Sequence, residues 1–269
     1  FRAYADLFPD ACLLLVDTYD TLKSGVPNAI RVFRELREKG HEPKGIRLDS
    51  GDLAYLSKRA RRMLDDAGFP DAIICASGDL DEHVIASLKN QGAKIDLWGV
   101  GTKLITSSDM PALGGVYKLS ALYPAGGGEI PKIKLSDNSD KITNPAFKDV
   151  WRIYDNETGK AEADLIVVRG ETFDESKPLT IFHPKETWKR ITFTDYTVRP
   201  LTVQVMRGGE LCAPLPPLSE ICAYASREKE SFWDEYKRQD NPHVYKVDLS
   251  QKLFDIKNKL ISQIRGNDG

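Results

Sequence analysis

The sequence has few cysteines, few histidines and no excess of either charge, and each shortage excludes a class of protein. Its 269 residues include four Cys, four His, 38 Lys and Arg, and 40 Asp and Glu. The cysteines have neither the paired spacing of a metal site nor the density of a disulfide framework. A net charge of -2 offers no basic surface for nucleic acid, and no apolar run is long enough to cross a membrane. We therefore expect a soluble, cytoplasmic protein that binds neither nucleic acid nor membranes.

Familiar catalytic motifs are also missing. The sequence contains no G-x-S-x-G element and no Walker loop. The four histidines, at positions 41, 83, 183 and 243, lack the spacing of a metal site or a hydrolase triad, which favours structural roles for them. The length permits one large domain or two modest ones. Because Phe1 already lies inside an amphipathic helical pattern, we expect the chain to be a portion of a longer protein.

Residues 1–122 alternate between apolar runs of strand length and helical patterns. Strands are predicted at 12–16, 44–48, 72–76 and 95–98, and helices at 26–39, at 52–68 and after residue 80. Unbroken apolar strands indicate burial on both faces, which favours a parallel sheet in a barrel or a doubly wound fold. Four strands cannot close a barrel, so in a barrel the remaining strands come from sequence outside this chain or from a partner.

Residues 123–269 predict a smaller β-rich and helical region. A strand-like run at 116–122 leads into a glycine-rich loop at 124–128. A hairpin is predicted from 150–154 and 163–168 around a turn at 155–159. Further strands are expected at 180–183, 189–194 and 201–206, followed by helices at 218–240 and 249–265. We place the boundary between the two regions after residue 122.

Acidic residues follow three of the predicted strands: Asp17 with Asp20, Asp49 with Asp52, and Asp79. The carboxyl ends of parallel strands meet at one edge of a sheet, where ligands bind. Such a cluster of carboxylates suits Mg²⁺ together with a polyphosphate, and carboxylates also accept protons from ribose hydroxyls. The alternative is that each carboxylate caps the helix that follows it.

Two further features at the same edge are not explained by helix capping. Arg47 lies on the second strand, next to Asp49. Gly78 and the loop Gly99-Val100-Gly101-Thr102 follow the third and fourth strands, and glycine lets backbone amides approach a phosphate closely. The sequence therefore predicts a site for a phosphorylated ligand.

Four segments together resemble nicotinate phosphoribosyltransferase. They are Leu15-Val16-Asp17-Thr18-Tyr19-Asp20-Thr21, Gly45-Ile46-Arg47-Leu48-Asp49-Ser50-Gly51-Asp52, Ala76-Ser77-Gly78-Asp79 and Trp98-Gly99-Val100-Gly101-Thr102. Residues 141–145 and 150–154 continue the resemblance. It implies synthesis of nicotinate mononucleotide and pyrophosphate from nicotinate and phosphoribosyl pyrophosphate, driven by ATP hydrolysis, in NAD biosynthesis. It also implies part of an irregular TIM-like α/β barrel of the type II phosphoribosyltransferases, a second domain and a homodimer with shared active sites.

The resemblance implies a role for each site residue. Arg47 would face the nicotinate carboxylate and ring, Asp49 the ribose hydroxyls, and Asp17 the Mg²⁺-pyrophosphate, with Asp17 and Asp49 as the metal ligands. These three form the expected catalytic set. Residues expected at the ribose 5-phosphate are Gly78, Asp79, Gly99 and Gly101, and Ser77 and Thr102 are also expected to bind substrate. Lys118 resembles a lysine that reaches the neighbouring subunit's phosphate site, and the family's phosphorylated histidine is expected before Phe1.

Two alternatives to this interpretation stay open at the level of sequence. Nicotinamide or quinolinate phosphoribosyl transfer shares the fold and differs in the base pocket. A chain without the phosphorylated histidine is also consistent with a catalytically silent half that binds nucleotide or forms a subunit interface.

Overall fold

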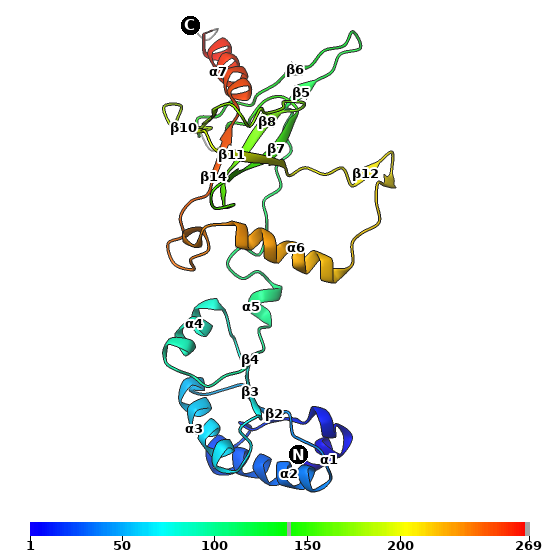
Figure 1. Cartoon of the computed structure of the whole chain (residues 1–269), viewed down its shortest axis with the longest axis vertical. Coiled ribbons are helices and arrows are strands. Elements are labelled where there is room, and N and C mark those ends of the chain that lie inside the picture. Colours follow the sequence, from blue (N-terminus) through cyan, green and yellow to red (C-terminus); the bar gives the residue numbers. More distant parts are fainter. Residues whose placement is uncertain (139–140, 267–269) are drawn as a thin grey trace. The chain divides into compact units, whose positions relative to one another are not determined.

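The computed structural model describes residues 1–138 and 141–266, and the chain divides into two compact units, Phe1–Gly115 and Val116–Gly269 (Figure 1). The division after Gly115 falls close to the boundary that we expected after residue 122. That the first region is part of a barrel and the second a separate β-rich domain stays a prediction. No helix in these ranges combines the length and apolar character that a membrane span requires.

Unit 1 is a parallel sheet flanked by helices. Its strands β1 (Leu13–Leu15), β2 (Gly45–Leu48), β3 (Ile73–Ala76) and β4 (Leu97–Trp98) lie in sequence order. The connections contain α2 (Val26–Glu38), α3 (Leu53–Asp66) and α4 (Glu82–Asn90). The short elements are α1 (Arg2–Leu7), a 3₁₀ turn at Pro9–Ala11, a π-helical turn at Thr21–Gly25 and α5 (Thr102–Ile105). Each strand predicted in this unit is present and is one to two residues shorter than expected.

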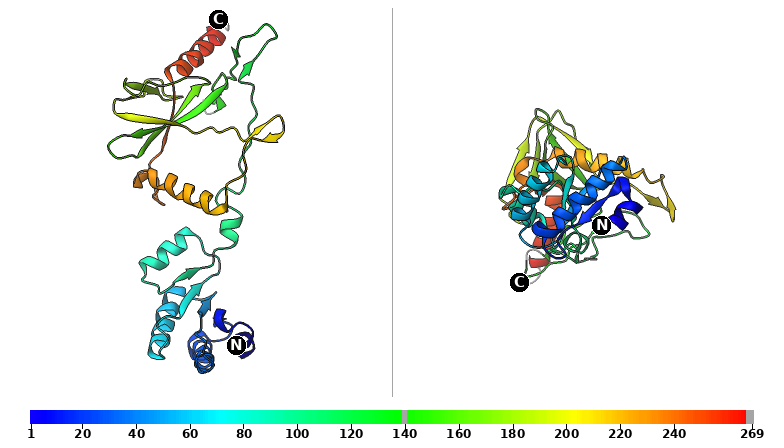
Figure 2. Two further views of the ribbon diagram at one scale, coloured as in Figure 1. Left: turned by 45° about the vertical axis from the view of Figure 1, so that its right-hand side comes forward. Right: turned by 90° about the horizontal axis from the view of Figure 1, so that it is seen from below.

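The core of unit 1 lies between the sheet and the helices α2 and α3, which run side by side in Figures 1 and 2. Alternate strand residues such as Ile46 and Leu48 are fully buried against Phe33 of α2 and Leu64 of α3. The residue between them, Arg47, is exposed. The opposite face of β2 therefore carries the side chain of Arg47, one of the predicted site residues, as the two-residue period of a strand requires.

Unit 2 is built on a mixed sheet with the order β10-β9-β14-β8-β7-β11. Its strands are β7 (Lys148–Asp155), β8 (Ala161–Val168), β9 (Leu179–Phe182), β10 (Arg190–Phe193), β11 (Tyr196–Pro200) and β14 (Lys246–Leu249). Two small ribbons pair β5 (Ala121–Leu122) with β6 (Ile130–Pro131) and β12 (Met206–Arg207) with β13 (Glu210–Leu211). The helices are α6 (Leu218–Ser231), a 3₁₀ turn at Asp234–Tyr236 and α7 (Gln251–Gly266).

Both faces of this sheet carry buried apolar side chains. Ile153, Leu165 and Ile181 form a cluster on one face, whereas Leu249 of β14 and Leu253 of α7 belong to a second cluster. The predicted hairpin is confirmed, since β7 and β8 pair antiparallel. Three other predictions were wrong in detail. Only Ala121–Leu122 of the run 116–122 is a strand, the run at 201–206 is replaced by β11 and β12, and the helix predicted to reach residue 240 ends at Ser231.

Candidate functional site

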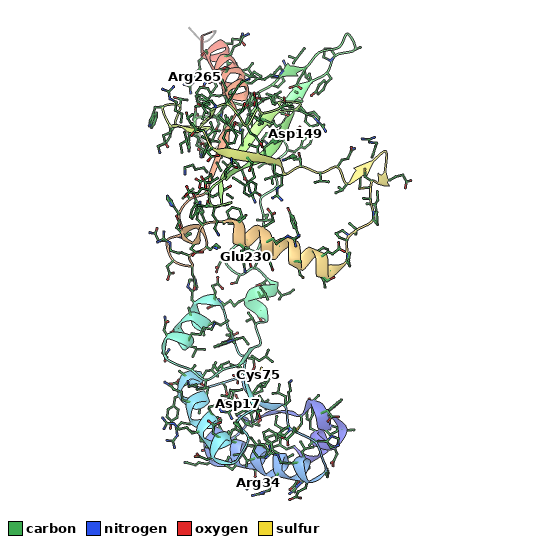
Figure 3. The ribbon with its side chains drawn as sticks, in the orientation of Figure 1. Asp17, Arg34, Cys75, Asp149, Glu230 and Arg265 are labelled. Atoms are coloured by element: carbon green, nitrogen blue, oxygen red, sulfur yellow. The ribbon has the colours of Figure 1, made fainter. Side chains whose placement is uncertain are left out.

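The carboxyl ends of β1, β2 and β3 bring the predicted site residues of unit 1 together. Leu15 is paired with Arg47, and Arg47 with Cys75, in parallel register. Asp17, Asp49 and Ser77 follow these positions and therefore lie at the same edge of the sheet. Figure 3 labels Asp17, which follows β1, and Cys75, which lies within β3.

Arg47, Asp49 and Ser77 form a closed hydrogen-bonded triangle. The guanidinium Nε of Arg47 donates to Ser77 Oγ at 2.8 Å, and its Nη2 donates to Asp49 Oδ1 at 2.8 Å. Ser77 Oγ in turn donates to the same oxygen of Asp49. These bonds, first that from Ser77 and then that from Arg47, hold the pKa of the Asp49 carboxyl below its usual range. The Arg47 and Asp49 side chains remain 44% and 43% exposed, so the triangle is open to a ligand.

Asp17 holds the loop that follows β2. Its Oδ2 accepts the backbone N–H of Asp49 at 2.8 Å and the Ser50 hydroxyl at 2.6 Å. Ser50 was not predicted as a site residue, although its position directly after Asp49 placed it at the same edge. Asp17 and Asp49 each keep one carboxylate oxygen outside these bonds, so both can accept a further donor or bind a cation.

Helix capping accounts for some of the acidic residues. Asp20 accepts the backbone N–H groups of Leu22 and Lys23, and Asp52 accepts that of Tyr55 at 2.9 Å. The capping alternative is therefore correct for Asp20 and Asp52. It does not apply to Asp49, whose side chain bonds Arg47 and Ser77 instead.

The chain after β3 passes close to the Asp49 backbone, which explains one glycine of the predicted phosphate loop. Gly78 has a left-handed φ of +92°, and a Cβ there would lie 2.3 Å from the carbonyl oxygen of Asp49. Asp79 also has a positive φ, of 48°. A Cβ at Gly99 would lie 3.2 Å from the Cβ of Ser77. Gly78 and Gly99 therefore permit close approach of the loops at this edge.

The remaining predicted residues, Gly101, Thr102 and Lys118, are not members of the triangle. Gly101 has open space around it, and Thr102 begins the four-residue helix α5. A cavity of about 210 Å³ adjoins this loop and is lined in part by Asp81, Val100 and Lys103. Lys118 belongs to unit 2, where its side chain is exposed. The other predicted site residues belong to unit 1.

The carboxylates of Asp17 and Asp49 are suited to Mg²⁺ that also binds water and substrate, and not to a metal ion whose ligands all come from the protein. Within the described residues there is no group of three or more His, Cys, Asp or Glu side chains that could hold an ion. Mg²⁺ commonly binds through one or two carboxylates and completes its shell with water and substrate phosphates. The oxygens of Asp17 and Asp49 that remain outside the hydrogen bonds fit that pattern.

Comparison with solved structures defines the class of fold. The chain superimposes on human nicotinic acid phosphoribosyltransferase with a TM-score of 0.75 and 28% identity, covering 96% of this chain and 48% of that one. It superimposes on nicotinate-nucleotide pyrophosphorylase from Pyrococcus furiosus with a TM-score of 0.51 and 18% identity, covering 86% of this chain and 54% of that one. The chain therefore has the mixed α/β fold of the matched parts of these two structures.

Sequence comparison gives a more specific similarity. Residues 147–257 match the nicotinate phosphoribosyltransferase C-terminal domain family. Over 265 residues the chain is 47% identical to nicotinate phosphoribosyltransferase of Bacillus subtilis, covering 98% of this chain and 54% of the relative. The chain is a homologue of nicotinate phosphoribosyltransferase, and it spans about half the length of the curated relatives it matches.

Proposed function

We propose that this chain provides the phosphoribosyl-transfer edge and the C-terminal domain of a nicotinate phosphoribosyltransferase that functions in NAD biosynthesis. The reaction joins the ring nitrogen of nicotinate to C1 of phosphoribosyl pyrophosphate as the C–O bond to pyrophosphate breaks, and ATP hydrolysis drives it. The observation that carries the proposal is the triangle of Arg47, Asp49 and Ser77 at the carboxyl edge of a parallel sheet. In this proposal the sheet of unit 1 is part of an irregular TIM-like barrel.

Arg47 is the residue that we assign to the nicotinate carboxylate. Ser77 and Asp49 occupy Nε and one donor of Nη2, so Nη1 lies outside these bonds. A planar guanidinium can pair a carboxylate through two parallel hydrogen bonds and also stack on an aromatic ring. This geometry favours nicotinate over nicotinamide, which carries no charge, and leaves quinolinate transfer as the second candidate because its substrate also has carboxylates.

Asp49 and Asp17 are assigned to the sugar and to the leaving group. Asp49 keeps one oxygen available for a ribose hydroxyl, and its lowered pKa keeps it ionised. Asp17, fixed by the Asp49 amide and Ser50, is placed to share Mg²⁺ with the pyrophosphate. When bound, Mg²⁺ supplies charge neutralisation to the departing pyrophosphate. The protein groups hold the sugar between base and pyrophosphate, since positioning contributes much of the rate in such transfers.

The loops after β3 and β4 are assigned to the ribose 5-phosphate. The residues in this assignment are Ser77, Gly78, Asp79, Gly99, Gly101 and Thr102. The close packing at Gly78 and Gly99 supports it, because small residues let backbone N–H groups reach an anion. Lys118 is proposed to reach the phosphate site of a second subunit in a cytoplasmic homodimer with shared active sites.

The test is a chimera in which this chain replaces the matched region of the Bacillus subtilis relative. We expect the chimera to form nicotinate mononucleotide from nicotinate, phosphoribosyl pyrophosphate, Mg²⁺ and ATP. Arg47→Lys should raise the KM for nicotinate strongly and leave the KM for phosphoribosyl pyrophosphate nearly unchanged. Arg59→Lys, at an exposed position of α3, is the matched control. Unaltered nicotinate kinetics in Arg47→Lys would refute the assignment.

The chain by itself should bind a phosphorylated ribose weakly and form no mononucleotide. It spans about half of the relatives' length, and one parallel sheet cannot enclose the transferring sugar. If the chain alone turned over at the rate of the chimera, the proposed division of the catalytic machinery would be wrong. Binding of ribose 5-phosphate without turnover, by contrast, is also what a catalytically silent half would show, and the activity of the chimera separates the two cases.

A further inference from the structure

Unit 2 contains a pocket of about 580 Å³ that the proposed reaction does not use. It lies in a gap of the mixed sheet: β14 pairs with β8 along its length but with β9 only between Leu249 and Phe182. Residues 183–185 and 188–191 form one wall, and residues 244–248 form the other. Small-molecule sites have volumes of about 300–1,000 Å³, so the pocket has the size of a ligand site.

The wall formed by residues 183–191 is rigid. Its loop is closed by a hydrogen bond from the backbone N–H of His183 to the carbonyl oxygen of Lys189 at 3.1 Å. The His183 ring accepts the N–H of Glu186 at Nδ1, which leaves the proton of the neutral ring on Nε2. From the core, Lys257 donates to the carbonyl oxygen of Pro184 at 2.8 Å. The pocket is thus preformed, which lowers the entropic cost of binding.

The charged side chains of the pocket suit an anion at the rim. Its lining contains Lys185, Lys189, Arg190 and Lys246 together with His183, against the single carboxylate of Asp248. Lys189 is paired with Glu186. In the described part of the chain, the side chains of Arg190 and Lys246 make no salt bridge, although Lys246 is close enough to Asp248 to attract its carboxylate. Arg190 and Lys246 can therefore both donate hydrogen bonds to a phosphate.

Two other side chains of the pocket could bind parts of a ligand other than a phosphate. Trp188 lines the pocket yet is 73% exposed, which leaves an indole face available for stacking on an aromatic base. Asp248 exposes only 5% of its surface, lines the pocket and accepts no hydrogen bond from another side chain in the described residues. Its carboxyl group lies near His183 and Lys246, and its oxygens can accept a further hydrogen bond from a ribose hydroxyl or an amino group of a ligand.

We propose that this pocket binds a mononucleotide, with the phosphate on Arg190 and Lys246, the base on Trp188 and a hydroxyl or amino group on Asp248. The occupant is a separate ligand from those assigned to the triangle, because all of the residues involved belong to unit 2. The inference therefore does not depend on the proposed transferase activity.

Isothermal titration of the purified chain with AMP, ribose 5-phosphate and adenosine tests the inference. AMP should bind more tightly than either of the others, since only AMP offers both a base and a phosphate. Trp188→Ala should weaken AMP binding by roughly tenfold or more, the scale of one lost stack. Asp248→Asn should also weaken it, because a hydrogen bond to a charged carboxylate is worth more than one to a neutral amide. Trp188→Phe should restore most of the affinity. Melting curves by circular dichroism establish that each variant is folded.

The controls separate this pocket from the edge of unit 1. Lys252→Ala removes an exposed lysine outside the pocket and should leave AMP binding unchanged. Trp188→Ala and Asp248→Asn should leave a nucleotide held by unit 1 unaffected, so a loss of AMP affinity in these variants assigns the binding to the pocket of unit 2. Equal AMP affinity in wild type, Trp188→Ala and Asp248→Asn overturns the proposal, as does an absence of AMP binding at millimolar concentration.

Discussion

The clearest test of how the site is held together compares two glycines. Gly78 and Gly92 both have left-handed φ, of +92° and +72°. Alanine at either position costs about 1–2 kcal/mol in backbone strain. At Gly92 the added Cβ meets nothing within 4 Å, whereas at Gly78 it would lie 2.3 Å from the carbonyl oxygen of Asp49. Overpacking adds about 1–3 kcal/mol. We expect a loss of about 1–2 kcal/mol for Gly92→Ala and about 2–5 kcal/mol for Gly78→Ala.

Hydrogen exchange measured in increasing urea provides the assay, because peptides from β2 and β3 report on unit 1 alone. The same variants in the chimera give a second measurement. Gly78→Ala should lower mononucleotide formation per folded molecule, since moving the Asp49 backbone moves the triangle, and Gly92→Ala should not. If the two variants lose the same stability within about 0.5 kcal/mol, the close approach of the two loops is not what requires glycine at position 78.

Three further predictions concern single side chains. Asp52→Ala should cost about 1 kcal/mol as a lost helix cap, while Asp49→Asn should cost less and abolish turnover of the chimera; urea unfolding beside rate assays decides this, and the reverse pattern would make Asp49 structural. Ser77→Ala should raise the pKa of Asp49, because the Ser77 hydrogen bond is the largest cause of its lowering. The stabilisation from the Asp49 carboxylate is lost as the pH falls from the pKa of the unfolded chain to that of the folded chain, and Ser77→Ala should make this pH interval narrower. A ¹³C carboxyl titration by NMR that shows no rise in the pKa contradicts this prediction. Burial lowers the pKa of Lys257 from 10.5 to about 8, so the free energy of unfolding of unit 2 should increase as the pH rises from about 8 to 10.5. Lys257→Met should remove most of this pH dependence in urea unfolding curves. The same pH dependence in the variant and the wild type would contradict the assigned pKa.

The strands of unit 1 could be predicted because their apolar runs are local and unbroken. The missed strands of unit 2 depend on distant partners: β14 lies between β8 and β9, which come more than sixty residues earlier in the chain. The helix predicted to reach residue 240 stops early because Phe232 leaves it to pack edge-on against Tyr245 at 5.0 Å and beneath Arg152 at 4.6 Å. The periodicity of apolar residues along the sequence does not predict contacts between residues so far apart in the chain.

The same distinction applies to the site. The sequence placed Asp17, Asp49 and Ser77 at one edge because each follows a parallel strand. The pattern of residues alone did not separate Asp49 from Asp52, since both are aspartates between a strand and a helix, and only the resemblance to a known family favoured Asp49. Contacts with the neighbouring strand distinguish the two aspartates. Ser77 at the end of β3 donates a hydrogen bond to Asp49, whereas Asp52 accepts one from the first turn of α3.

The pairing of Arg47 with Asp49 has a consequence for how the site responds to ionic strength. The guanidinium is already paired with an internal carboxylate, so an incoming anion shares the guanidinium with Asp49 instead of neutralising an isolated positive charge. Binding of this kind releases few counterions, and affinity should therefore change little with salt concentration. Discrimination then depends on whether a ligand can bond the guanidinium from its other side without displacing Asp49, which makes the site sensitive to the shape of an anion more than to its charge.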